Sequence, residues 1–486
     1  MELNIYWASL FIFVPIVVLA AGLRVVLQRL HGKWTKQTCH YDNEAKVFRK
    51  VFLRVYLIVM ASEWLQGPYL YTLFRDEKGL EDRTVAILYI TTYVSAAISA
   101  FFTGYLADRF GRRAACLVFC GAHSLASISV KFDAMELMII GRVLSGISLN
   151  LLWTVFESWM ITEYSARALD RSSLPLSAMF GAMTRYNCVT AILAGIIGYY
   201  IVLSTGSKAN PFIAGVVLDV AAAFLMFRTW NENKGVDNNL DLCNKNDLAN
   251  DQATTKLKER PLAMLRDARI WVLSFVSCCF EGTMFIFTFF WPGTLQEAHS
   301  RYQTHGNDAT PFGVIFATFM ATMVLGAMLF SLFTRNANPT AIEHTSTLGD
   351  ISPTALLTTA LFIGGSSFII AAFSKAELHL YLAFLLLEFC NGIYVPSMAY
   401  HRGMIVANSS RTLVYGLMNI PLFVFVVIAL YTTTSNGVEY RRVVFASSAL
   451  LLLAAGAAVV LGLGILTNHL KNSLGEELEK EDLSEI

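Results

Sequence analysis

Long, uninterrupted apolar runs are the feature of this sequence that most limits its fold. A first run at 5–27 is followed by twelve more, at 51–74, 84–107, 114–131, 135–162, 177–203, 211–228, 270–293, 311–333, 354–374, 379–401, 412–431 and 442–467. A helix needs about 20 apolar residues to cross a membrane. Because the runs are continuous rather than alternating, they favour helices over the strands of a membrane barrel. The sequence predicts an all-α polytopic membrane protein.

Composition removes several other classes of protein. Only 15% of the residues are charged, and 37 basic against 36 acidic residues leave a net charge of +1. A nucleic-acid binder would carry a basic excess, so no nucleic-acid partner is expected. We find no nucleophile–base pair, no metal-ligand cluster and no phosphate-binding loop of the G-x-x-x-x-G-K-[ST] type. These patterns predict neither an enzyme nor a primary pump, and no resident cofactor or metal.

The basic residues set the predicted orientation. If the first helix enters from outside, the cytosolic segments hold 25 Lys and Arg and the external segments hold 9. Cytosolic loops carry the excess of positive charge in membrane proteins. The amino terminus is therefore expected outside and the carboxyl terminus in the cytosol.

A polar stretch divides the twelve later runs into six and six. Residues 229–269 are rich in Asn, Asp and Lys and are expected to form a cytosolic linker. The predicted division is therefore an anchor helix with a basic segment (1–50), an N-terminal six-helix bundle (51–228), the linker, a C-terminal six-helix bundle (270–467) and an acidic tail (468–486).

Ionisable side chains inside the runs mark a candidate site. Each would raise the insertion free energy by about 2.5–3.5 kcal/mol at the bilayer centre, so they are expected to face an aqueous cavity or one another. The seven are Glu63, Arg142, Glu157, Arg185, Asp219, Glu281 and Glu388. Those in the first, fourth, seventh and tenth of the twelve runs predict that these four helices surround a central path. Asp219 lies in a helix expected to be peripheral, and functional and structural roles stay equally open for it. The histidines give no clear signal.

A ten-residue motif lies between the second and third of the twelve runs. It reads GYLADRFGRR, with Gly104, Asp108, Arg109, Gly111, Arg112 and Arg113 as its distinctive members. Glycine at the first position permits close helix contact, Gly111 turns the chain, and the arginines can pair with acids on neighbouring helices. The motif resembles the loop signature of the major facilitator superfamily, which implies two six-helix halves. Here an additional N-terminal helix precedes them, and residues 104–113 would form the cytosolic gate.

A narrower resemblance rests on four segments. They are ASEWLQGPYLY (61–71), FESWMITEY (156–164), FEGTMFIFTFFWPGTL (280–295) and LLLEFCNGIYVPSM (385–398). These resemble the eukaryotic molybdate-anion transporter family, a branch of the same superfamily, and the resemblance covers roughly residues 50–470. It implies a secondary active transporter that takes up molybdate by alternating access.

Under this interpretation the polar residues take two roles. The substrate-binding candidates are Arg142, Arg185, Asn187, Gln66, Asn150 and Asn391. The candidates for proton coupling or ion pairing are Glu63, Glu157, Glu281 and Glu388. Five acids against two arginines fit a divalent anion poorly. Either the acids are protonated when the anion binds, or the substrate is a cationic or neutral solute.

Other possibilities stay open at this stage. A sensor that retains the fold without transporting would explain the same motifs. The expected partners of a transporter are molybdate or a related oxyanion, protons as a candidate coupling ion, and the lipid bilayer. A multi-pass protein that takes up an anion is expected in the plasma membrane.

Overall fold

The helices of the N-terminal part follow the apolar runs closely. The computed structural model describes residues 5–31, 40–169, 176–233, 267–302, 310–333, 352–405, 411–433 and 439–465. The first seven long helices are α1 (Ile5–His31), α2 (His40–Gln66), α4 (Asp82–Phe110), α5 (Arg112–Ser129), α6 (Met135–Ala166), α7 (Leu176–Thr205) and α8 (Asn210–Thr229). The predicted run 51–74 does not match a single helix. Helix α2 starts eleven residues before it, at His40, and ends before the pair Gly67–Pro68.

Proline lacks the N–H that a continuing helix needs, which accounts for the end of α2 at Gln66. After a turn the chain resumes as α3 (Leu70–Thr72) and a π-helical segment, η2 (Leu73–Glu77).

In its described ranges, the C-terminal part contains six more long helices. They are α11 (Ala268–Tyr302), α12 (Phe312–Phe333), α13 (Pro353–Phe373), α14 (Glu377–Ile405), α15 (Arg411–Thr433) and α16 (Glu439–Ala458), the last followed by the π-helical η5 (Val459–Ile465). Each of the thirteen predicted runs thus corresponds to a helix. Among the described residues, nine helices are long and apolar enough to cross a membrane. Helices α1, α2, α5 and α15 are shorter in their apolar stretch or more polar.

The chain separates into two units. The first contains residues 1–244, 288–324 and 426–435, and the second contains 245–287, 325–425 and 436–486. Most of the predicted linker 229–269 and the whole tail 468–486 lie outside the described residues, so the domain boundaries at 229, 270 and 468 stay predictions.

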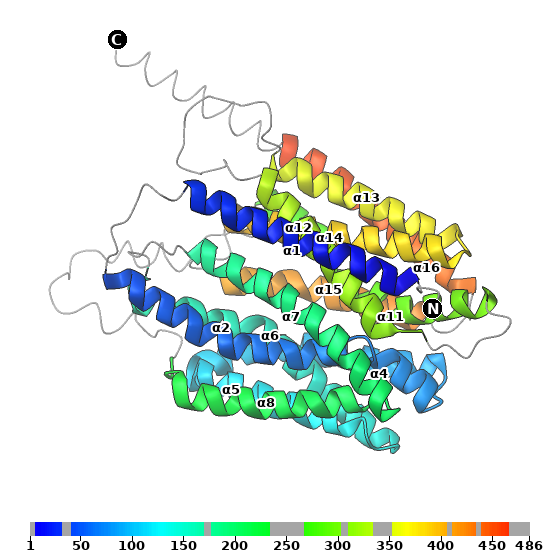
Figure 1. Cartoon of the computed structure of the whole chain (residues 1–486), viewed down its shortest axis with the longest axis horizontal. Coiled ribbons are helices and arrows are strands. Elements are labelled where there is room, and N and C mark those ends of the chain that lie inside the picture. The colour runs from blue at the N-terminus through cyan, green and yellow to red at the C-terminus, as the bar shows by residue number, and fades with distance from the viewer. Residues whose placement is uncertain are drawn as a thin grey trace, which may run out of the picture. The chain divides into compact units, whose positions relative to one another are not determined.

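Helix pairs in the first unit set the positions of the polar side chains discussed below. Helix α2 packs against α7 and α8, α5 packs against α6 and α8, and α4 packs against α6. Figure 1 shows α2, α5, α6 and α8 side by side. Gly146 lets α6 approach α4 closely, since a Cβ there would lie 2.2 Å from the carbonyl oxygen of Thr92.

An aromatic cluster fills one end of the first unit. Trp159 of α6 stacks on Trp230, which follows α8, with ring centroids 3.8 Å apart. Phe52 of α2 stacks on both tryptophans, at 6.2 and 5.7 Å. Aromatic pairs of this kind stabilise a fold beyond the area they bury. In the second unit, α13 packs against α14 and α16.

Candidate functional site

A buried histidine joins three helices of the first unit. His123 of α5 is 4% exposed, and its ring lies between carboxylates from two other helices. Its Nδ1 atom is 2.7 Å from Oδ2 of Asp219 on α8, and its Nε2 atom is 3.1 Å from Oε2 of Glu63 on α2. Asp219 is fully buried, whereas the side chain of Glu63 is 33% exposed. The three side chains form a cluster, called here the α5 triad, which is ion-paired when the imidazole is protonated.

Polar neighbours complete the surroundings of the α5 triad. Gln66 of α2 places its amide nitrogen 3.3 Å from Nε2 of His123 and donates to Ser127 at 2.9 Å. Ser62 lies 3.3 Å from Nδ1 and donates to the carbonyl of Gly215 at 3.0 Å. Gly215 leaves room for these side chains, because a Cβ at that position would lie 2.8 Å from the Gln66 amide nitrogen and 3.1 Å from the Ser62 hydroxyl. Helices α2 and α8 therefore meet closely at the triad.

Two residues of this region, His123 and Asp219, add to what the sequence predicted. His123 was not singled out, although it is a histidine inside an apolar run with Ser127 one turn further on, which is a usable signal. Asp219 was expected in a peripheral helix, which stays a prediction. Its helix α8 packs against α2 and α5, and its carboxylate is buried against His123.

Arg142 of α6 is the buried arginine of the first unit. It is 3% exposed, and its guanidinium lies over the ring of Phe74, 5.6 Å from the centroid. Tyr89 and Glu63 are close enough to interact with it electrostatically. Within the described part of the chain, its Nε atom has no hydrogen-bond partner. A buried guanidinium with unused donor capacity is suited to an oxyanion.

Two more predicted residues of α6 lie further along that helix. Asn150 is buried and donates to the hydroxyl of Thr103 on α4 at 2.6 Å. Glu157 is partly buried and acts electrostatically on Tyr56 of α2. In this structure Asn150 therefore links two helices through a hydrogen bond.

Helix α7 carries Arg185 and Asn187. Arg185 is exposed, and among the described residues no hydrogen bond or ion pair involves its side chain. Asn187 is partly buried and accepts a hydrogen bond from the indole nitrogen of Trp64 on α2 at 2.8 Å. The two candidates are thus in different surroundings, and only Asn187 is tied to a neighbouring helix.

The second unit has its own ion pair, between α11 and α14. Glu281 accepts from Arg402 at 2.8 Å, from Tyr394 at 3.0 Å and from Ser277 at 2.9 Å. Ser277 also accepts from Arg402 at 2.6 Å. Arg402 was not among the sequence candidates because it follows the predicted run 379–401, but α14 continues to Ile405 and includes it.

Glu388 and Asn391 lie on the same face of α14, as their spacing predicted. Glu388 is 5% exposed and accepts from the Asn391 amide at 3.0 Å. A buried carboxyl group that receives one amide donor can exist in the protonated form, which is compatible with the predicted role in proton coupling.

The motif 104–113 forms the turn between α4 and α5. Gly111 has φ of 122°, a conformation that favours glycine, and a Cβ there would lie 2.4 Å from the carboxylate of Glu232. Glu232 accepts from the backbone N–H groups of Arg113 and Ala114, at 2.8 and 3.2 Å. It thereby caps the first turn of α5, where unpaired N–H groups favour a carboxylate.

Two arginines of the motif contact residues outside it. Arg113 forms a 3.6 Å ion pair with Glu232, and Arg112 donates to the carbonyl of Ser158 on α6 at 3.3 Å and also contacts Thr162. Arg109 is exposed, and its guanidinium lies over the ring of the adjacent Phe110. The expectation for Gly104 is wrong in this structure, since a Cβ there would meet nothing within 4 Å. The side chain of Asp108 lies outside the described residues.

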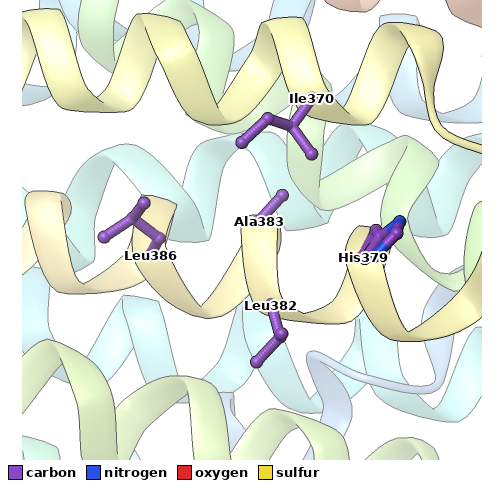
Figure 2. A pocket seen from close by; sticks show the side chains of 5 residues that line it. All are labelled: Ile370, His379, Leu382, Ala383 and Leu386. Atoms are coloured by element: carbon purple, nitrogen blue, oxygen red, sulfur yellow. The ribbon is translucent and has the colours of Figure 1, made fainter.

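A shallow depression on the surface of α13 and α14 is a different kind of feature. Figure 2 shows its lining, which consists of Ile370, His379, Leu382, Ala383 and Leu386. It encloses about 220 Å³ and has one polar side chain among these five. These five residues provide no buried charged side chain to pair with an ion, so the depression is not a candidate ion site. In the described ranges, no cluster of His, Cys, Asp and Glu is arranged to hold a metal ion.

Comparison with known proteins agrees with this helix arrangement. A family described as sugar transporters with 12 transmembrane segments matches residues 12–384. The chain is 29% identical over 437 residues to the molybdate-anion transporter of Danio rerio, covering 86% of each protein. It is 28% identical to the molybdate-anion transporter of Takifugu rubripes, again covering 86% of each.

Solved structures support the fold. The peptide transporter PepTSo superposes with a TM-score of 0.63 at 13% identity, covering 86% of this chain and 97% of that one. The nucleoside transporter NupG gives 0.59 at 11% identity, with 86% and 99% covered. At such low identity these structures are informative about the fold alone.

Proposed function

Because this chain belongs to the eukaryotic molybdate-anion transporter family of the major facilitator superfamily, we propose that it carries molybdate or a related oxyanion into the cell. The protein is a multi-span membrane transporter. Its specific substrate, its coupling to protons and its place in the plasma membrane are parts of the proposal. The proposed mechanism is alternating access, as in other secondary transporters built from two helical repeats.

The burial of Arg142 is the observation that most strongly supports an oxyanion as the substrate. A charge that is 3% exposed raises the free energy of the folded protein by several kcal/mol unless an ion or strong hydrogen bonds offset it. In the described ranges no carboxylate lies within 4.0 Å of its guanidinium nitrogens, which leaves it available to a substrate. A guanidinium presents paired N–H donors that match two oxygens of a tetrahedral oxyanion.

The pairing of buried acids supports an anionic substrate further. The seven ionisable residues identified in the sequence include five acids and two arginines, which would make a cavity too negative for molybdate. A protonated His123 offsets one of the two charges of Glu63 and Asp219, and Arg402 offsets that of Glu281. With these two additional basic groups, binding an anion at Arg142 no longer requires every acid to be protonated.

The remaining candidates have supporting roles in the proposal. Gln66 of α2 lies beside the α5 triad, and Asn187 of α7 lies beside Trp64. The amide of each can donate to a substrate oxygen. Arg185 supplies a second positive charge from α7 when the anion occupies the site. Glu157 and Glu388 provide protonatable groups in α6 and α14.

A second candidate is transport of a neutral solute, which the description of the matching family as sugar transporters favours. Counterflow in proteoliposomes separates the candidates. Liposomes with purified protein are loaded with unlabelled molybdate, sulfate or glucose, and entry of labelled molybdate or labelled glucose is followed. We expect molybdate inside to drive transient accumulation of labelled molybdate, and glucose to drive nothing.

Counterflow of glucose without counterflow of molybdate would overturn the substrate assignment. Absence of counterflow with every solute, from protein that is folded and binds molybdate, would favour a sensor over a transporter. Substitution of Arg228, an exposed arginine at the end of α8, by Gln gives a control for loss of a positive charge outside the proposed site.

A further inference from the structure

The hydrogen-bond partners of His123 fix one of its two ring nitrogens as a donor. Ser62 gives its own hydroxyl hydrogen to the Gly215 carbonyl at 3.0 Å, so it offers only lone pairs to Nδ1. Oδ2 of Asp219 lies 2.7 Å from the same nitrogen and also accepts from Ser124 at 3.3 Å. Two acceptors facing one ring nitrogen require that it carry hydrogen. Nδ1 of His123 is therefore protonated whether the ring is neutral or charged.

The other nitrogen, Nε2, has two partners with opposite requirements. The Gln66 amide nitrogen, 3.3 Å away, is a donor and needs a lone pair on Nε2. The Glu63 carboxylate, 3.1 Å away, is an acceptor and needs hydrogen on Nε2. One nitrogen satisfies only one of these at a time. Gln66 matches the neutral ring and Glu63 matches the imidazolium, so the two contacts correspond to two protonation states.

Exposure indicates where a proton would enter. His123 is 4% exposed and Asp219 is fully buried, whereas the Glu63 side chain is 33% exposed. Glu63 is thus the member of the α5 triad that can exchange protons with water, and Asp219 holds the imidazole from the opposite side. Phe119 stacks on the ring at 5.3 Å between centroids, which fixes its orientation.

Five helices, α2, α4, α5, α6 and α8, place a titratable or charged group in or near the α5 triad. Glu63 comes from α2 and Asp219 from α8. On α5 itself, Cys120 interacts electrostatically with Asp219. Tyr93 of α4 and Arg142 of α6 both interact electrostatically with Glu63. Arg142 and a charged His123 balance the two carboxylates, so loss of one proton leaves this group with a net negative charge.

We propose that Nε2 of His123 is the proton-binding site that couples transport, with Asp219 orienting the ring and Glu63 exchanging the proton with water. This inference rests on the proposed transport function and names its coupling element. A protonated Glu63 gives its proton to Nε2, which leaves a carboxylate paired with an imidazolium. The contact from Gln66 to Nε2 is then broken, and the amide of Gln66 becomes available to the substrate oxyanion.

The return step reverses these contacts. When Nε2 gives its proton back through Glu63, its lone pair again accepts from Gln66. The amide is then held by His123 and by Ser127, 2.9 Å away. Proton occupancy and substrate contact are thereby linked through a single residue of α2, and a proton bound at His123 also adds positive charge near Arg142.

Transport under an imposed pH gradient tests the coupling. Proteoliposomes with wild type, His123→Gln, Glu63→Gln and, as a matched control, His379→Gln are assayed with labelled molybdate, with and without an alkaline interior. His379 is an exposed histidine of α14 outside the proposed site. We expect wild type and His379→Gln to accumulate molybdate with the gradient. His123→Gln should lose gradient-driven accumulation to the level of protein-free liposomes while retaining molybdate exchange.

Glu63→Gln keeps the contact between Asp219 and His123, so it provides a second variant if His123→Gln does not fold. It should slow gradient-driven uptake more than exchange. The inference is overturned if wild-type exchange is present but insensitive to the gradient, or if His123→Gln responds to the gradient as wild type does. In both cases the proposed substrate stands. Absence of any molybdate exchange by wild type would instead overturn the proposed function.

A substrate-independent measurement decides the inference in that last case. Nuclear magnetic resonance of nitrogen-labelled imidazoles in detergent identifies His123 by comparison with His123→Gln. The two flanking carboxylates favour the charged ring, so the titration runs from about pH 5 to about pH 11. Over this range we expect protonation to change at Nε2 and to stay constant at Nδ1. A change at Nδ1, or none at either nitrogen, would contradict the assignment.

Discussion

Replacing Asp219 by Asn tests whether the buried contact with His123 stabilises the fold. Asp219 is fully buried and its carboxylate lies 2.7 Å from Nδ1 of His123, so the substitution removes the negative charge that faces the ring. Breaking a buried ion pair by removing one partner destabilises a protein by about 3–5 kcal/mol. Asn can still accept one hydrogen bond from Nδ1, so we expect the lower end, about 3 kcal/mol.

This loss converts into a measurable change in melting temperature. In a domain of roughly 150–250 residues, 1 kcal/mol corresponds to about 2–4 °C, so Asp219→Asn should lower the Tm by roughly 6–12 °C. A thiol-reactive dye in detergent can follow unfolding, because Cys116 and Cys120 are unpaired and buried. Asp133→Asn is the control, since Asp133 pairs with Lys78 at 2.6 Å but its side chain is 92% exposed. Asp133→Asn should change the free energy of unfolding by no more than about 1 kcal/mol.

A double-mutant cycle then isolates the pair. The double variant His123→Gln with Asp219→Asn has no buried charge left unpaired between α5 and α8. Its destabilisation should be smaller than the sum of the single effects by about 0.5–3 kcal/mol, the range observed for residues in contact. Additive effects, or a Tm for Asp219→Asn equal to that of the exposed control, would refute the reasoning.

Three further predictions concern other parts of the chain. Gly313→Ala should destabilise by about 1–3 kcal/mol, because its Cβ would lie 2.4 Å from the Gly195 carbonyl oxygen; thermal unfolding checks this, and Gly121→Ala, whose Cβ would meet nothing within 4 Å, should not destabilise. Asp108→Asn should lower the rate of transport with little change in substrate affinity, and initial rates over a range of molybdate concentrations distinguish these; a large affinity loss at normal turnover would contradict the gate assignment. Arg185→Lys should weaken molybdate binding while the protein still folds, because it keeps the charge but loses the forked donors; equal protection by molybdate against thermal unfolding in wild type and variant would remove this arginine from the site.

The helices could be predicted from the sequence because their signal is local and strong. A run of about 20 apolar residues has few stable alternatives in a membrane. The spacing of Glu388 and Asn391 similarly predicted a shared face, and the structure joins them by a hydrogen bond. The turn at Gly111 was predicted from its glycine, and the observed φ of 122° has the same cause.

Contacts between distant helices could not be predicted in the same way. Whether Asp219 is peripheral depends on which helices α8 packs against, and no local pattern contains that information. The partner of Glu281 was missed for another reason. Arg402 lies just beyond the apolar run, and hydropathy ends the helix where the polar residues start, although the helix continues to Ile405. Uncertainty at helix ends therefore hid an ion pair inside the second unit.

Binding of molybdate to purified protein is a direct test of the assignment of Arg142 to an oxyanion site. Titration calorimetry is performed on wild type, Arg142→Gln and the exposed control Arg228→Gln, with sulfate and glucose as competitors. We expect saturable molybdate binding to wild type and Arg228→Gln, competition by an oxyanion but not by glucose, and loss of binding in folded Arg142→Gln. Binding of glucose in place of molybdate, or unchanged molybdate affinity in Arg142→Gln, would contradict the assignment.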